Sequence, residues 1–132
     1  DTPMRKVYVL RWDGQRKVYS SPAVHLDIES MGSGVDGATV DADGNLWCVL
    51  IRRATIACYS PEGVLLREIS APVDLPSSLC FGGPDMGTLF LTSIQDSGSG
   101  RAISKHPLGG HLFAADGLGA KGLADTAYGT AG

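Results

Sequence analysis

No apolar stretch in the 132 residues approaches the roughly 18 residues that a membrane-spanning helix requires, so we expect no membrane contact. Basic residues do not cluster either: no basic run is longer than two residues, as at Arg52–Arg53, and the formal net charge is −3. A nucleic-acid surface needs a basic stripe that displaces counterions from phosphate. The composition therefore argues against nucleic acid as a partner.

Cysteine is scarce, and its three positions are Cys48, Cys58 and Cys80. All three lie in apolar, strand-like runs, with no Cys-x-x-Cys pair and no histidine at metal-binding spacing nearby. This setting favours buried free thiols in a reducing compartment, hence a cytoplasmic location, over a catalytic or metal role. The start at Asp1, without an initiator Met or a signal-like segment, predicts a processed or cut N-terminus.

Glycine is abundant, with 18 residues placed between short apolar runs, and hydrophobic residues make up 43% of the chain. The runs recur about every 8–12 residues and are bounded by turn residues, which predicts an all-β fold with a packed core. No segment predicts a helix. No Gly-x-Ser-x-Gly motif or phosphate-binding glycine loop is present.

The first predicted strands are Arg5–Trp12 and Lys17–Ser21, which a tight two-residue turn at Asp13-Gly14 would join. Pro22–Gly34 is predicted to be a looser connection. The remaining predicted strands are Gly37–Asp41, Leu46–Ile51, Thr55–Ser60, Leu65–Ser70, Ser78–Phe81, Thr88–Ile94, His111–Ala115 and Gly122–Tyr128.

Two stretches resemble each other: Val35–Val40 lines up with Pro76–Phe81, at an offset of 41 residues from position 36 to position 77. A period of about 40–50 residues with four strands per unit is typical of β-propeller blades. We therefore predict a partial β-propeller of about two and a half four-stranded blades. Its parts are the outer strands of an incomplete blade plus a connection (1–34), one blade (35–75) and another blade (76–132) with a long loop (95–110).

A propeller needs at least about four blades to close its ring. Left open, these blades would expose unpaired strand edges, which proteins rarely tolerate. The sequence thus implies a partner that completes the ring, either a second half-propeller or further copies of this chain in a homo-oligomer.

Five motifs, in order along essentially the whole chain, resemble those of one family, the gluconolactonase, regucalcin and senescence-marker-protein family of sugar lactone lactonases. These motifs are Val35–Trp47, Tyr59–Ile69, Phe81–Thr92, Gly109–Phe113 and Gly117–Leu123. The resemblance implies a six-bladed propeller that hydrolyses sugar lactones with one bound divalent metal ion (Ca²⁺, Zn²⁺, Mn²⁺ or Mg²⁺). This chain would correspond to its C-terminal half.

In that family the metal lies in the central channel and is held by a Glu, an Asn and an Asp. Only the Asp has a counterpart here, Asp36, so the resemblance implies a metal site that is incomplete in this chain alone. An inner propeller strand points its first residues toward the axis, where a hard carboxylate ligand suits a divalent ion. Asp36 would be the metal ligand and the catalytic base, which would take a proton from water. The alternative is that Asp36 only begins an Asp-Gly turn, as Asp43-Gly44 does.

Ser77 and Arg52 are the candidate substrate-binding residues. Ser77 is equivalent to Asp36 in the next blade, although a surface turn would also explain it, and Arg52 would reach a sugar hydroxyl unless it is a solvated hairpin tip. His106 lies in the long connection 95–110. This connection would fold over the channel mouth as a lid, or His106 would simply be solvated in a polar loop. The alternating oxygens of Asp41–Asn45 are interpreted as a blade turn, because the run is too short for an EF-hand loop.

The sequence thus predicts a metal-dependent sugar lactone hydrolase, or the C-terminal half of one, whose substrate is a sugar lactone. One alternative is a non-catalytic assembly module, which pairs its open edges with another half-propeller. Another is a separately encoded half, whose partner half supplies the missing Glu and Asn.

Overall fold

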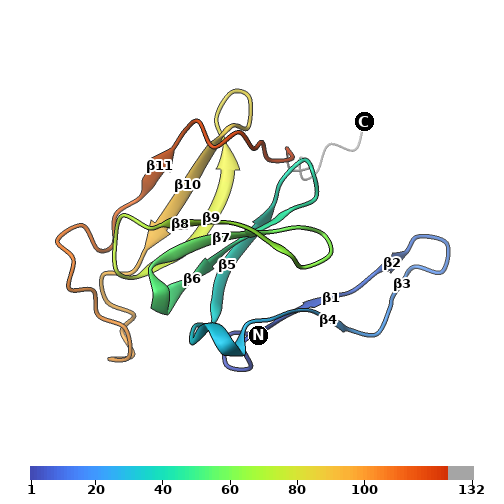
Figure 1. Cartoon of the computed structure of the whole chain (residues 1–132), viewed down its shortest axis with the longest axis horizontal. Helices are drawn as coiled ribbons and strands as arrows, with labels where there is room; N and C mark the ends of the chain where they lie inside the picture. The colour runs from blue at the N-terminus through green and yellow to red at the C-terminus, as the bar shows by residue number, and fades with distance from the viewer. Residues whose placement is uncertain (125–132) are drawn as a thin grey trace.

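The computed structural model describes residues 1–124, and these residues are almost entirely β-structure (Figure 1). The strands are β1 (Lys6–Val9), β2 (Trp12–Asp13), β3 (Val18–Tyr19), β4 (Ala23–Asp27), β5 (Val35–Val40), β6 (Leu46–Leu50), β7 (Thr55–Tyr59), β8 (Leu65–Ser70), β9 (Pro76–Gly82), β10 (Thr88–Ser93) and β11 (Phe113–Ala115). Two 3₁₀ turns, η1 (Glu29–Met31) and η2 (Ile51–Arg53), are the helical elements of this part of the chain. None of its helices has the length and apolarity to cross a membrane. The predicted strand Gly122–Tyr128 lies mostly outside the described residues.

The chain begins as one long bent hairpin in which β1 pairs with β4 and β2 pairs with β3. The predicted two-residue turn is wrong, because Asp13 pairs with Val18 and leaves four residues in the loop. The Asp13 carboxylate accepts the backbone N–H groups of Gln15 and Arg16, and Lys17 closes the loop with a positive φ of 54°. This Asx-type turn, closed by the Asp13 side chain, forms in place of the predicted two-residue turn.

The predicted looseness of Pro22–Gly34 is also wrong, since this stretch contains β4 and η1. Leu26 and Ile28 are buried there, against the face of the following sheet. Leu26 and Ile28 are the two fully buried apolar side chains of this stretch, and two alternating positions are too short a pattern for a strand to be recognised from sequence.

The middle of the molecule is a complete four-stranded blade, with β5, β6, β7 and β8 hydrogen-bonded in sequence order. Strand β6 is buried on both faces. Trp47 and Val49 face one core cluster, which they share with the next sheet, while Cys48 and Leu50 face a second cluster, which they share with the first hairpin. The middle blade therefore requires a neighbour on each side.

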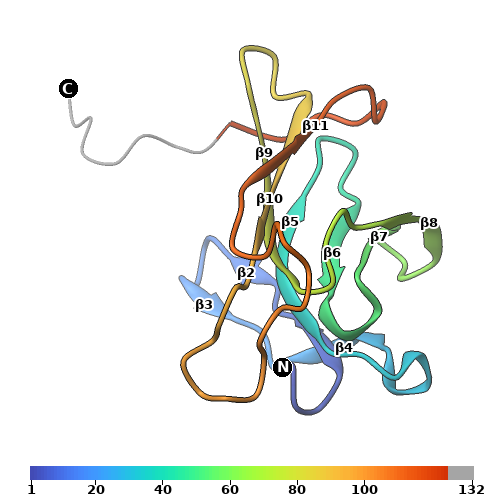
Figure 2. The same cartoon turned by 90° about the vertical axis from the view of Figure 1, so that its left-hand side faces the viewer.

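The next sheet contains three described strands in the order β11-β10-β9, and its innermost strand β9 lies beside β5 (Figures 1 and 2). Gly37 makes this approach possible, because a Cβ built there would overlap the Cα, Cβ and Oγ atoms of Ser78. Sheets stacked face to face in this way form the blades predicted from the sequence period.

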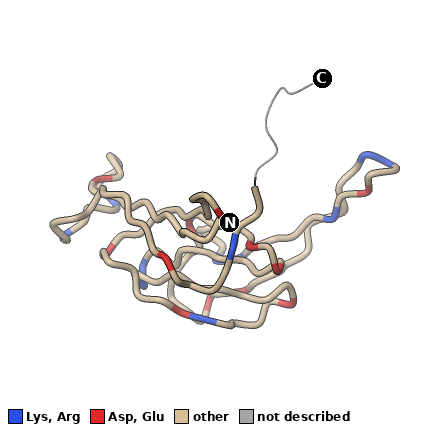
Figure 3. The backbone as a smooth tube through the Cα atoms, turned by 90° about the horizontal axis from the view of Figure 1, so that it is seen from above, with Lys and Arg blue, Asp and Glu red and all other residues tan. Residues whose placement is uncertain are grey.

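Two of the three cysteines are buried free thiols, as predicted, and burial raises the pKa of Cys48 to about 12. The prediction that Cys80 is buried is wrong: it is exposed. Its strand alternates, so Leu79 and Phe81 point into the core while Cys80 points to the opposite face, which no other described sheet covers. Charged residues of both signs are interspersed along the chain (Figure 3).

Replacing Gly37 by Ala is expected to lower the free energy of unfolding by about 1–3 kcal/mol, because the added methyl group forces β5 away from β9. Urea denaturation measures the change. Gly14→Ala is the matched control, since its nearest neighbour is 3.7 Å from the new Cβ, and should change stability by less than about 0.5 kcal/mol. Equal effects of the two substitutions would contradict the close approach.

Candidate functional site

The three sequence-predicted site residues lie at one end of the blades, where β5 and β9 begin; we call it the leading end. Asp36 and Ser77 are the second residues of β5 and β9, which run in the same direction (Figures 1 and 2). Arg52 lies in η2, and the pairing of Val35 with Leu50 places η2 at the same end. No hydrogen bond or ion pair joins these three side chains within the described residues.

The two inner strands share an irregularity at these positions. Strand β5 has one extra residue between Val35 and Ala38, opposite the step from Leu50 to Cys48 in β6. Strand β9 likewise has one extra residue, Ser77, opposite the step from Thr92 to Ser93 in β10. A β-bulge changes the direction of a side chain and interrupts regular pairing. The bulge recurs at the offset of 41 residues that relates Asp36 to Ser77.

Asp36 lies within β5, so the alternative that it begins an Asp-Gly turn is wrong. Its side chain is exposed, and no described group donates a hydrogen bond to its carboxylate. Partial desolvation raises its pKa above the ordinary value of 3.8. An aspartate that is partly desolvated and without a partner is a suitable ligand for a cation, because the cation would supply the missing charge partner.

Ser77 is half-buried, and its hydroxyl is 2.8 Å from that of Thr92. Thr92 also accepts the Ser78 backbone N–H at 3.1 Å, so this pair of hydroxyls closes the bulge. Thr92 Oγ1 in turn donates to the Ser78 carbonyl, so the Ser77 hydroxyl is the one of the two with an acceptor site left for a polar ligand. Ser77 is part of a strand bulge, so the turn alternative for this residue is also wrong.

Arg52 is exposed, and it lines a shallow hollow with Thr2, Arg5 and Gly34. Its backbone N–H donates to the buried Ser33 Oγ at 3.1 Å, which fixes η2 at the leading end. Arg53 instead pairs with Glu68 at 3.1 Å. Of the two neighbouring arginines, Arg52 is the one without an ion pair among the described residues.

The described residues include no group of three or more His, Cys, Asp or Glu side chains that would hold a metal ion. Asp36 therefore fits a divalent metal as one oxygen ligand of a larger set. The described residues do not form that set by themselves.

The opposite, trailing end contains the Asp41–Asn45 run, and its interpretation as a blade turn is confirmed. Asp41 is 2% exposed, and its carboxylate accepts hydrogen bonds from the Asn45 side chain, from Trp47 Nε1 at 2.8 Å and from the backbone of Asp43 and Asn45. Desolvation would raise the pKa of Asp41, but these hydrogen bonds outweigh it and lower the pKa. Arg67 lies over the Trp47 ring at 5.7 Å from its centroid. All four bonds are internal, so this cluster is structural.

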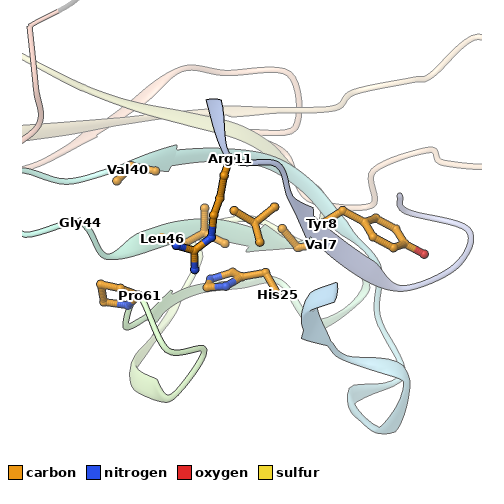
Figure 4. Close-up of a pocket in the computed structure, with 9 residues that line it drawn as sticks. Val7, Tyr8, Arg11, His25, Val40, Gly44, Leu46 and Pro61 are labelled. Carbon is orange, nitrogen blue, oxygen red and sulfur yellow. The ribbon is translucent and has the colours of Figure 1, made fainter. Parts of the chain in front are cut away.

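A hollow that the sequence did not predict lies between the first hairpin and the middle blade (Figure 4). Val7 of β1 lies across it from Val40 and Leu46 of the blade, and the Arg11 side chain extends toward Leu46. Val9 also lines the hollow. Strand β1 pairs with β4 on one edge, and no other described strand pairs with its second edge. The hollow is therefore an apolar surface next to a free strand edge.

We expect Asp41→Ala to lower the free energy of unfolding by about 2–3 kcal/mol at neutral pH, because it leaves Trp47 Nε1–H and the turn N–H groups without an acceptor. Since the folded-state pKa of Asp41 is depressed, its contribution is complete above the ordinary value of 3.8 and is lost as the pH falls through the folded value. Denaturant titrations at neutral and acid pH measure both effects. Asp43→Ala, in the same turn, should change stability by less than about 0.5 kcal/mol, and a comparable loss would refute the assignment.

Comparisons with known proteins agree with this architecture. A family model described as "SMP-30/Gluconolactonase/LRE-like region" matches residues 1–95. Regucalcin of Xenopus laevis is 34% identical over 94 residues, which cover 70% of this chain and 31% of that protein. The 6-deoxy-6-sulfogluconolactonase of Pseudomonas putida is 30% identical over 114 residues, covering 86% of this chain and 39% of that enzyme.

Two solved structures share the fold. A luciferin-regenerating enzyme superposes with a TM-score of 0.75 at 28% identity, over 94% of this chain and 42% of the other. A calcium-binding regucalcin of Agrobacterium tumefaciens gives a TM-score of 0.80 at 24% identity, over 93% and 42%. The predicted fold class, a partial propeller, is thereby confirmed. The chain spans about a third of the length of the curated relatives that it matches.

Proposed function

The chain belongs to the SMP-30/gluconolactonase/LRE-like family, and on that premise we propose that it is one half of a metal-dependent sugar lactone hydrolase. The observation that supports this most is Asp36, a carboxylate without a hydrogen-bond or ion-pair partner among residues 1–124, placed by a bulge on an inner strand at the leading end. The coarser assignment, to a family that contains lactonases, rests on the comparisons alone.

In this proposal Asp36 holds a divalent ion (Ca²⁺, Mg²⁺, Mn²⁺ or Zn²⁺) through a carboxylate oxygen. When bound, that ion supplies Lewis-acid polarisation of a lactone carbonyl. Asp36 also accepts the proton of the attacking water. Ser77 and Arg52 orient the lactone by hydrogen bonds to its hydroxyl groups.

The remaining ligands, in this proposal, come from a second half-propeller or from another copy of the chain. The free edge of β1 and the apolar hollow beside it support this, because a complete blade has two more strands at that position, as β5–β8 shows. The free thiols support a cytoplasmic location, which is also part of the proposal.

A non-catalytic assembly module is the second candidate, and the same hollow favours it. In that case the partner covers the hollow, but no metal binds at Asp36. Loss of assembly and loss of chemistry must therefore be measured separately.

The enzymatic proposal is tested by hydrolysis of glucono-δ-lactone, with the spontaneous rate subtracted, before chelation, after chelation and after metal is restored. The chain is assayed alone and with the half that completes it. Chelation should abolish turnover and metal should restore it, and Asp36→Asn should lower turnover by about 100-fold or more. Asp43→Asn, an exposed aspartate of the trailing end, is the matched control. Full metal binding and turnover in Asp36→Asn would refute the assignment.

Assembly is tested by Val40→Glu, which places a charge in the hollow at a side chain already 45% exposed. We expect it to weaken association by at least about tenfold in Kd, because association would take the carboxylate out of water. Sedimentation velocity over a range of concentrations measures this. Val64→Glu, at a valine 59% exposed outside the hollow, should have no effect. Equal effects, or a wild-type chain that never associates, would argue against this surface.

A further inference from the structure

The long connection between β10 and β11, residues 95–110, lies at the leading end and bends inward. Strand β10 is the middle strand of its sheet, between β11 and β9. The hydrogen-bonded pairing of β10 with β9 continues for one residue beyond Ser93, because the Ile94 N–H donates to the Leu75 carbonyl at 2.9 Å. Leu75 lies just before β9. A loop from β10 to β11 would be expected above the gap between those two strands.

The returning half of this loop instead reaches the approach to β9. The Ser104 N–H donates to the Gln95 carbonyl at 2.9 Å, which holds the returning segment beside the outgoing one. Ser104 Oγ then donates to one carboxylate oxygen of Asp74 at 2.5 Å, and the Lys105 N–H donates to the other at 2.7 Å. Asp74 lies three residues before Ser77, so the loop crosses β10 and borders the inner strand.

The contact between Ser104 and Asp74 is tightly packed and anchors the loop. Ser104 is 9% exposed, and its Oγ also accepts the His106 N–H at 3.1 Å. Gly109 packs against Ser104 so closely that a Cβ at Gly109 would overlap the Ser104 side chain. The two donors from the loop lower the pKa of Asp74, so the carboxylate is ionised at neutral pH. Charge-assisted hydrogen bonds of this kind are stronger than neutral ones.

We propose that Asp74 is a positioning residue that holds residues 95–110 as a fixed rim along the inner strand beside Ser77, where Lys105 and His106 border the bound substrate. The substrate part of this inference rests on the proposed function. A fixed rim limits which substituents on the ring of the lactone fit at the leading end. In this inference the connection predicted as a lid is held in a fixed position at the leading end.

The anchor is tested in the full chain by hydrogen exchange at the Ser104 and Lys105 amides. Asp74→Ala and Ser104→Ala remove opposite partners of the same bond, and each should accelerate exchange at these amides by about tenfold or more. Ser99→Ala is the matched control, because Ser99 bonds only within the loop tip, to Ser97 and Arg101. Exchange that is unchanged in both anchor variants would overturn the anchor.

The substrate part is tested with glucono-δ-lactone, in the same preparations that test the proposed function. Asp74→Ala should raise KM by about threefold or more while kcat stays within about twofold, as expected when binding but not chemistry is weakened. A merely structural anchor would accelerate exchange without moving KM, and that result would overturn the rim. If the wild type hydrolyses no lactone under any condition, the proposed function and the substrate part both fail, while the exchange data still decide the anchor.

Discussion

The burial of strand β6 on both faces is the constraint on which the rest of the structure depends. Because its successive side chains enter two different cores, the middle blade needs apolar cover on each side. The sheet of β9, β10 and β11 covers one side, and the first hairpin covers part of the other. Where that cover is incomplete, the hollow of Figure 4 remains, lined by Val40 and Leu46. The hollow is thus a consequence of the packing of β6.

The same packing determines the candidate site. Face-to-face stacking requires β5 and β9 to approach each other, and Gly37 permits this next to Asp36. The two bulges, at equivalent positions, interrupt the ladders where regular pairing would otherwise fix the side chains above or below the sheet. Asp36 and Ser77 are therefore brought to neighbouring places by the backbone, without any bond between their side chains. Arg52 and Asp74 reach the same end because η2 and the approach to β9 lie there.

The blade strands and their repeat could be predicted from the sequence, because period-2 patterning and turn residues are local signals. Asp36 was singled out by the family resemblance and Ser77 by the repeat, while the blade turn at Asp41–Asn45 followed from its local residues. Strand β4 was missed because few of its side chains enter the core. Cys80 was wrongly predicted to be buried because an apolar run does not show which of its alternating side chains faces the core. Asp74 gave no signal at all, since its partner Ser104 is 30 residues away and is brought near only by the path of the loop.

The repeated bulge also fixes the direction of a side chain without fixing its chemical identity. In one blade the bulged position carries a carboxylate and in the next a hydroxyl, although the backbone irregularity is the same. Equivalent backbone positions in the two described blades are thus open to different chemical groups. In such an architecture, new chemistry requires one substitution in one blade and no rearrangement of the scaffold. A side chain at Gly37, by contrast, would overlap Ser78 and separate the two strands that carry these positions.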